Sequence, residues 1–336
     1  TIKVSGVQKG SPADGKLNNG DEIIGLGSAK FGKDPKRDVA AAIDLAETEA
    51  SGGKMTLMMK GGKTVVLELP VLGSYSATAP YNCPKTDKII TMAAEHLLKS
   101  KSKNGSRLHP ELLGLMATGE KKYIDAAAEE ILSADWAKPD PVKVDHILSG
   151  EVGSGSVGWT WGYDLITLSE YHLLTGDKSV LPSIKILAVA LAKGQDAAGL
   201  WGHRMASPQR YGRLPGYAQM NQSSMSCFMG MLLAKKCGIS DPDLEKGIAK
   251  TYAYVASHVG RGSFPYGVHG PNSSVFNNNG SSASAALCMA LKDNSEGAAF
   301  FSHLTATSYD GLEKGHASAF FNPFWTPLGA NLSGPE

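Results

Sequence analysis

The chain has 336 residues, and 42% of them are hydrophobic, so it is long enough for about two domains with large buried cores. Its 33 Lys and Arg residues almost balance 32 Asp and Glu residues. The net charge of +1 argues against the broad basic surface of proteins that bind nucleic acid or anionic membranes. The longest apolar helical stretch, 184–192, is far shorter than the roughly 20 residues that cross a bilayer, so no transmembrane segment is expected.

The four cysteines Cys83, Cys227, Cys237 and Cys288 lie far apart, and none forms a CxxC pair. Neither a zinc knuckle nor a disulfide framework is therefore indicated, and we expect buried thiols and no cofactor. The chain begins at Thr1 rather than Met, which indicates that a leader or a longer upstream region has been removed and somewhat favours export.

Residues 1–72 are predicted to form a small β-rich domain. Ser11-Pro12 and Gly61-Gly62 mark turns. The expected elements are strands at 2–4, 22–26, 55–60 and 64–69, a short helix ending near 17, and an alanine-rich helix near 38–50.

The string GSPADGKLNNGDEIIGLG (10–27) and this order of elements closely resemble a PDZ domain over residues 1–70. PDZ domains bind a peptide C-terminus as an added strand, so the resemblance implies a protein or peptide partner. In the family, the carboxylate nest and the peptide-binding edge strand precede the strand that matches 2–7. The groove is therefore incomplete in the chain as written, and a docking or packing role is the alternative.

A linker at 73–84, rich in small residues and proline, separates this domain from a helical region at 85–336. Apolar periodicity predicts helices at 86–99, 111–118, 122–134, 161–175, 179–193, 217–236, 242–259 and 280–291.

A repeat underlies these helices. LLGLMATGEKKYIDAAAEEI and YHLLTGDKSVLPSIKILAVA share a helix that ends in Thr-Gly-acid-Lys, and looser copies of the turn follow near Gly238 and Asp293. Gly119, Gly176 and Gly238 are 57 and 62 residues apart, which is typical of two helices per repeat. About four repeats are visible, whereas closed barrels of such hairpins need about six, so the repeats form an open arc or the natural chain continues past residue 336. We expect the chain to be a fragment at both ends.

Gln195, Gly199 and Trp201 follow an apolar helix with the spacing Q-x3-G-x-W. In such a turn the glycine permits a tight backbone, the amide caps backbone groups, and the indole packs on the next helix. The spacing resembles the repeat signature of squalene cyclases and prenyltransferase-like proteins, which form an α/α toroid.

The whole chain is similar to a bacterial family of unknown function that joins a PDZ domain to such a toroid. The residues that carry this likeness are LPVLGSYSATAPYNCPK, LLTGDKSVLPSI, GQDAAGLWGH and GHASAFFNPFWTPLG. It implies a multidomain α+β fold, with an α/α toroid at 85–336 after a PDZ-like domain without its first strands. It implies no activity.

Four loops rich in glycine and aromatic residues recur at one phase of the repeat, so they should gather on one face. A lyase that acts on uronate polysaccharides needs a carboxylate neutraliser, a base and an acid, and these loops supply all three types. The catalytic candidates are His203, Tyr211, Asn221, Tyr266 and His269. The candidates for substrate binding are Trp161, Arg204, Arg213, Tyr217, His316 and Trp325.

Other chemistries have fewer matching residues. A terpene cyclase needs an Asp-x-Asp-Asp string, and none occurs. A zinc site could combine Cys227 with His269 or His316, although their spacing is unconstrained. Glycoside hydrolysis needs two carboxylates. Asp164, Glu170 and Asp196 are available for it, but Asp164 and Asp196 fall where helix caps are expected.

Two functions follow from the sequence. One is a periplasmic or secreted carbohydrate-active protein with lyase or hydrolase chemistry in the glycine-rich loops. The other is a non-catalytic scaffold that binds a peptide or protein. Convergence of His203, Tyr266 and His269 in one pocket would favour catalysis, whereas side chains bonded to their own loops would favour binding.

Overall fold

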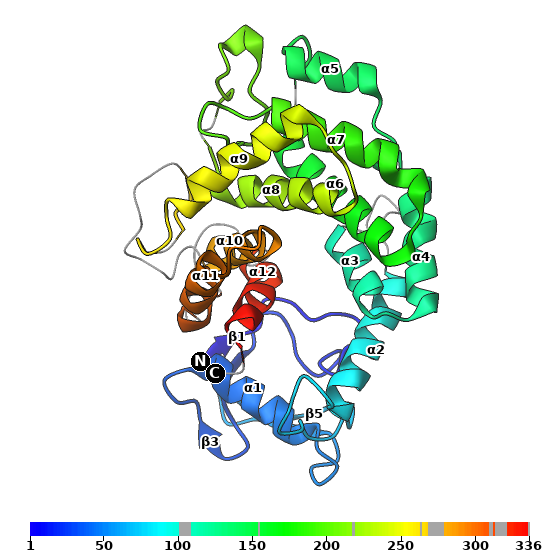
Figure 1. Ribbon diagram of the computed structural model, residues 1–336. Helices are drawn as coiled ribbons and strands as arrows, with labels where there is room; N and C mark the ends of the chain where they lie inside the picture. The colour runs from blue at the N-terminus through cyan, green and yellow to red at the C-terminus, as the bar shows by residue number, and fades with distance from the viewer. Residues whose placement is uncertain are drawn as a thin grey trace. The chain divides into compact units, whose positions relative to one another are not determined.

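The computed structural model describes residues 1–100, 109–153, 155–216, 219–262, 264–267, 279–308, 312 and 321–334. Figure 1 shows the α+β fold, which clusters into two compact units, unit 1 (Thr1–Lys99) and unit 2 (Ser100–Glu336). Unit 1 contains a small antiparallel sheet, and the described part of unit 2 is helical. Among the described helices, none combines the length and the hydropathy needed to span a bilayer.

The sheet of unit 1 has the order β1-β2-β4-β5, and β3 pairs with β2. The strands are β1 (Ile2–Lys3), β2 (Glu22–Leu26), β3 (Ala29–Lys30), β4 (Lys54–Met59) and β5 (Thr64–Glu68). Burial alternates along β2, β4 and β5, so one face of the sheet packs on the core. The four predicted strands are confirmed to within two residues. The short helix predicted before Leu17 is wrong, because that segment forms turns instead.

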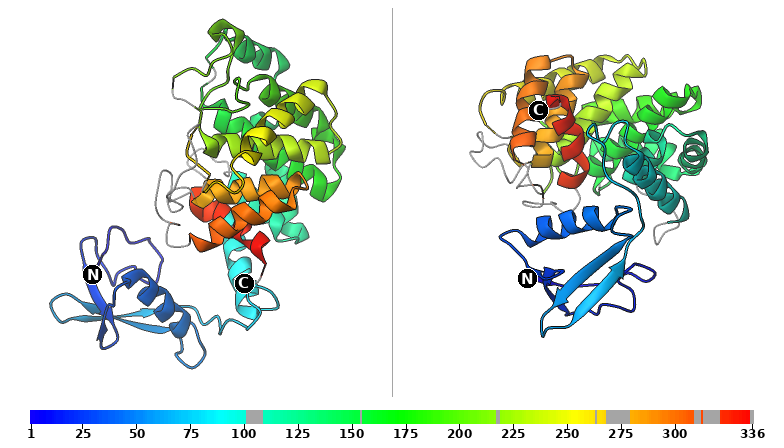
Figure 2. Two further views of the ribbon diagram at one scale, coloured as in Figure 1. Left: turned by 60° about the vertical axis from the view of Figure 1, so that its left-hand side comes forward. Right: turned by 90° about the horizontal axis from the view of Figure 1, so that it is seen from below.

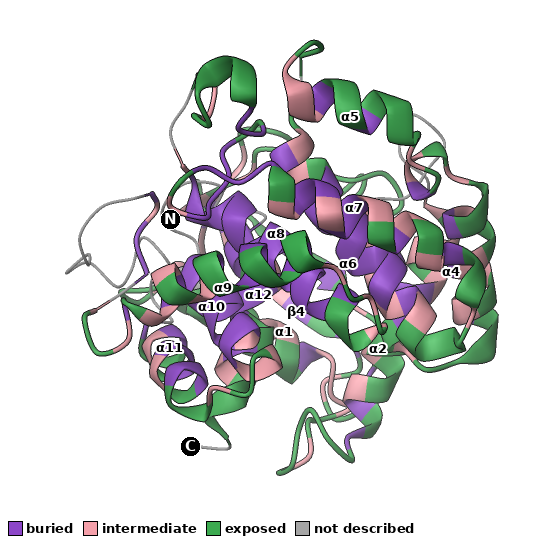
Figure 3. Cartoon of the chain, turned by 45° about the horizontal axis from the view of Figure 1, so that its top comes forward, coloured by how far each residue is buried: buried purple, intermediate pink, exposed green. Residues whose placement is uncertain are grey.

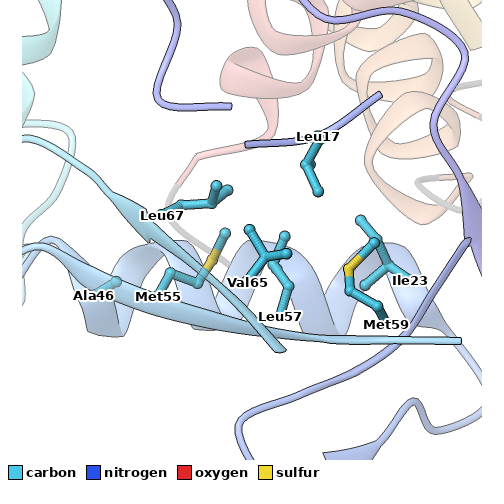
Figure 4. Close-up of a cluster of buried hydrophobic side chains, with 8 residues drawn as sticks. All are labelled: Leu17, Ile23, Ala46, Met55, Leu57, Met59, Val65 and Leu67. Atoms are coloured by element: carbon cyan, nitrogen blue, oxygen red, sulfur yellow. The ribbon is translucent and has the colours of Figure 1, made fainter. Parts of the chain in front are cut away.

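Helix α1 (Pro35–Ala46) contacts β2 and β4 (Figure 2). Its start is fixed by Asp34, whose side chain accepts hydrogen bonds from two backbone amides of the first turn. Figure 4 shows the apolar cluster that α1 and the sheet share. Its members are Leu17, Ile23, Ala46, Met55, Leu57, Met59, Val65 and Leu67.

Helix α2 (Pro84–Lys99) is anchored to the end of α1 by a buried ion pair. Lys85 is only 1% exposed, and its Nζ lies 2.8 Å from a Glu47 carboxylate oxygen and 3.1 Å from an Asp44 oxygen. Burial lowers the pKa of Lys85, but the hydrogen bonds to Glu47 and Asp44 outweigh that effect and leave the pKa raised. Lys85 is therefore kept protonated at a site with almost no access to solvent.

Unit 2 is built from helical hairpins arranged in two layers. The described helices are α3 (His109–Ala117), α4 (Lys121–Ser133), α5 (Pro141–Ser149), α6 (Val157–Thr175), α7 (Leu181–Lys193), α8 (Asn221–Lys236), α9 (Pro242–Ala256), α10 (Asn279–Leu291), α11 (Ser295–Thr307) and α12 (Phe321–Ala330). The first layer consists of α3, α6, α8, α10 and α12, which contact one another in that order, and α5, α7 and α9 form an outer row. Figure 3 shows α8 almost wholly buried and α5 largely exposed.

The predicted repeat turns close these hairpins. Gly119, Gly176 and Gly238 have φ values of 71°, 73° and 85°, a backbone region in which a side chain is strained. The fourth turn uses Asp293 at φ 59°, and acidic residues are among the few non-glycine residues that tolerate this region. The shared sequence of the turns therefore reflects one backbone conformation.

Three helices, α5, α11 and α12, are absent from the sequence prediction. Two predicted loops are partly helical, because α6 and α12 extend into them. Helix α5 begins with Asp140 before Pro141, a strong start signal that was missed. Helix α12 falls in a segment rich in glycine and aromatic residues that the sequence predicts as a loop, and Pro327 lies inside the helix. Helix α6 begins at Val157, so Trp161 and Asp164 lie within a helix. Helix α11 follows the Asn294 cap, and its amphipathic pattern is weak.

Candidate functional site

The Gln195–Trp201 turn follows α7 and is held to α9 by side-chain hydrogen bonds. The Gln195 Nε2 group donates to the Gly247 carbonyl at 3.0 Å and to Thr251 Oγ1 at 2.7 Å, both on α9. The Asp196 carboxylate accepts from the amides of Ala198 and Leu200, each at 3.0 Å. Both polar side chains thus stabilise the turn, and the Asp196 carboxylate binds backbone amides of its own turn rather than facing a substrate.

Loop segments meet the N-terminal ends of three first-layer helices. The Gly158 amide of α6 donates to the His203 carbonyl at 2.9 Å, and the Asn221 amide of α8 donates to the Tyr266 carbonyl at 2.8 Å. The Phe264 amide donates to Ser282 Oγ of α10 at 3.3 Å. We call this region, where residues 200–203 and 264–267 cross the ends of α6, α8 and α10, the polar end of unit 2.

The close approach at the polar end gives a stability prediction. A Cβ atom on Gly158 would lie 2.1 Å from the Gly202 carbonyl oxygen, so Gly158→Ala is expected to destabilise unit 2 by about 1–3 kcal/mol. A helical glycine without such a neighbour would gain up to about 1 kcal/mol from the same change. Urea unfolding followed by tryptophan fluorescence measures the effect, because all five tryptophans follow residue 100. Gly153→Ala is the control, since no atom lies within 4 Å of its Cβ position, and a stable Gly158→Ala would contradict the packing.

Three catalytic candidates lie at the polar end, and each has a protein partner. The indole of Trp159 donates to Nδ1 of exposed His203 at 3.1 Å, which in a neutral ring places the proton on Nε2. The Nδ2 group of fully buried Asn221 donates to the Pro265 carbonyl at 2.7 Å. The hydroxyl of Tyr266 lies 3.4 Å from Met220 Sδ. The fourth, His269, lies outside the described residues, as do Tyr217 and His316.

The two tryptophan candidates belong to the packed interior. Trp161 is 8% exposed within α6, and Trp325 is 2% exposed within α12. The Trp325 indole donates to the Tyr163 hydroxyl at 3.2 Å, and burial raises the pKa of Tyr163 to about 12. Neither indole is placed to stack on a polymer.

A buried histidine–aspartate pair was missed by sequence reasoning. His109 Nε2 lies 2.9 Å from an Asp164 oxygen, and His109 Nδ1 lies 3.2 Å from Thr167 Oγ1. Burial raises the pKa of Asp164, although the bond to His109 counteracts it. Asp164 is therefore not the predicted helix cap. Both ring nitrogens have partners, so the pair fastens α3 to α6, and no local pattern marks it because 55 residues separate its members.

The thiol suggested for a zinc site is part of the α6–α8 contact. Cys227 is fully buried, its Sγ donates to the Gly158 carbonyl at 3.1 Å, and burial raises its pKa. In the described parts of the chain, no three His, Cys, Asp or Glu side chains are grouped closely enough to hold a metal. His269 and His316 are outside those parts.

The remaining candidates form an ordered, exposed loop. Within residues 203–213, which we call the arginine loop, the Gly212 amide donates to the Ser207 carbonyl at 2.9 Å and the Arg213 amide to the Arg210 carbonyl at 3.0 Å. Tyr211 sits at the tip with 94% of its surface exposed, and its φ and ψ of 54° and 36° are left-handed. A bulky residue in that region is an outlier that calls for an explanation.

The arginine loop is also strongly basic. It carries Arg204, Arg210 and Arg213, all exposed, and the sequence has no Asp or Glu from 197 to 240. Among the described residues, none of these arginines takes part in an ion pair. One short loop therefore exposes three arginines and Tyr211 to solvent.

Comparison with known families gives one match. A family described as "Domain of unknown function (DUF6288)" matches residues 86–336. No curated protein and no solved structure matches the chain. The matched region contains both the polar end and the arginine loop.

Proposed function

We propose that this chain, which belongs to the family with the domain of unknown function DUF6288, binds an acidic polysaccharide without transforming it. The observation that carries the proposal is Tyr211, an aromatic side chain 94% exposed in a left-handed backbone conformation. Structural needs alone would favour glycine or asparagine there. A ring held in that position suits a flat, apolar sugar face.

The charges of the arginine loop support a ligand with carboxylates. Guanidinium groups bind carboxylates through paired hydrogen bonds, and Arg and Tyr dominate many binding surfaces. The loop carries three exposed arginines within ten residues of sequence, whereas the chain as a whole has a net charge of only +1. A short uronate polymer fits this small basic patch better than a nucleic acid or a membrane, which need a wider positive surface.

The partners of the other candidates support binding over chemistry. His203 and Asn221 both hold neighbouring segments of unit 2 by hydrogen bonds. Asp164 pairs with His109, and Asp196 caps a turn, so neither is presented as a glycosidase carboxylate. A periplasmic or secreted location is part of the proposal.

The alternative function, capture of a peptide strand by a PDZ-like unit 1, has less support. Strand addition needs a free edge, and the sheet ends on one side in β1, which has only two residues, and on the other side in β5. The Lys16 ammonium donates to the Val66 carbonyl of β5 at 3.0 Å, which is a common way to discourage pairing at an edge.

Titration calorimetry with trigalacturonate tests the proposal. We expect Tyr211→Ala to weaken binding at least about tenfold, which corresponds to about 1.4 kcal/mol. Arg213→Gln should weaken it too and should reduce its dependence on salt. Tyr81→Ala is the matched control, because Tyr81 is 62% exposed and lies outside the arginine loop.

Two outcomes would overturn the proposal. One is equal affinity of wild type and Tyr211→Ala for trigalacturonate. The other is tighter binding of neutral maltotriose or of oligothymidylate than of trigalacturonate, because the first contains no carboxylate and the second is a nucleic acid.

A further inference from the structure

Unit 2 contains a cavity of about 690 Å³ between the C-terminal halves of its first-layer helices. It lies among α3, α6, α8, α10 and α12. Sixteen of its eighteen lining residues are uncharged and largely apolar, and Leu174 and Leu328 at its wall are 47% and 49% exposed. Apolar side chains lining a concavity and still exposed are typical of a ligand site.

The volume limits what can enter. A helix with side chains is about 10 Å across and rises 1.5 Å per residue, so the cavity would hold only about six residues of one. Cavities of about 300–1,000 Å³ are typical of small-molecule sites. The occupant is therefore a small molecule with a large apolar part rather than a partner helix.

The two ionisable groups in the lining decide the kind of head group. Glu170 is half-buried, and burial raises the pKa of its carboxyl group. Lys236 is exposed at the last position of α8. Its neighbour Lys235 pairs with Glu245, whereas Lys236 makes no ion pair within the described residues. The exposed Lys236 ammonium is therefore available to pair with an anionic head group, whereas the Glu170 carboxyl group is half-buried.

We propose that this cavity binds a single-chain amphiphile with an anionic head, such as a fatty-acid carboxylate. The hydrocarbon chain of the ligand lies among the apolar walls of α6, α8 and α10, and its carboxylate pairs with the Lys236 ammonium. This site is separate from the arginine loop, since no residue from 203–213 lines the cavity. It can therefore be tested without any polysaccharide.

Calorimetric titration of the full chain with dodecanoate, below its micelle concentration, tests the proposal. Dodecanoate should bind at least tenfold more tightly than octanoate, because each buried methylene is worth roughly fourfold in affinity. Dodecyltrimethylammonium should bind more weakly than dodecanoate. Lys236→Gln should weaken dodecanoate about tenfold, and Glu170→Gln should not weaken it.

A variant that blocks the cavity tests whether the ligand binds there. Ala117 lines it and is exposed at the end of α3, so Ala117→Phe fills space without disturbing the core and should weaken dodecanoate at least tenfold. Ala253→Phe, at an exposed position of α9 outside the cavity, should bind as wild type does. No difference between these two variants, or tighter binding of the cationic probe, would overturn the proposal.

Discussion

Replacing Trp201 by alanine should lower the free energy of unfolding of unit 2 by about 3–5 kcal/mol, the usual cost of truncating a fully buried tryptophan. Trp201 has no exposed surface, and its indole donates to the Leu191 carbonyl at the end of α7 at 3.0 Å. The variant loses packing and leaves a buried carbonyl without its donor. Urea unfolding followed by the remaining tryptophans measures the loss.

Tyr211→Ala is the matched control for Trp201→Ala. Tyr211 lies on the loop that follows the same turn, but it is 94% exposed, so its removal should change stability by less than about 0.5 kcal/mol. If Trp201→Ala were as stable as Tyr211→Ala, the Gln195–Trp201 turn would not hold α7 and α9 together as described.

The second large effect is expected at Lys85. Lys85→Met leaves the Glu47 carboxylate, which is only 13% exposed, without its closest partner. Breaking a buried pair in this way costs about 3–5 kcal/mol, because a poorly hydrated charge stays behind. Unit 1 contains no tryptophan, so hydrogen exchange of the β4 amides is the suitable measurement of its stability.

Lys121→Met provides the comparison for Lys85→Met. Lys121 also pairs with a carboxylate, that of Asp125, but the two side chains are 87% and 59% exposed, so the expected loss is below about 1 kcal/mol. The folded pKa of Lys85 is raised, so its contribution is fully present below the unfolded value of about 10.4 and disappears only as the pH rises through the folded value. The loss caused by Lys85→Met should therefore be equal at pH 7 and pH 9, and a loss below 1 kcal/mol would contradict a buried pair.

Local sequence patterns were sufficient for most of the helical hairpins. The Thr-Gly-acid-Lys turns encode a left-handed residue after a helix, and that conformation depends on the glycine itself. Helix α12 shows where such reasoning fails. Pro327 normally breaks a helix, but here the buried Phe321 and Trp325 hold the helix through tertiary packing, which a local pattern does not reveal.

The candidate site was less predictable than the fold. Sequence reasoning selected His203 and Asn221 by their chemistry, yet their roles depend on Trp159 and Pro265, which are 44 residues away from them in sequence. The sequence selects Tyr211 as a catalytic candidate, and only its backbone conformation and exposure suggest a binding role. Contacts between distant segments decide whether a polar residue is structural, and composition does not contain that information.

The most direct test of the proposed function is hydrogen exchange of the full chain with and without trigalacturonate. The proposal predicts slower exchange in peptides from the arginine loop, 203–213, and no change in that loop when maltotriose replaces trigalacturonate. Protection elsewhere in the chain with none in 203–213, or no protection at a concentration that saturates binding, would contradict it.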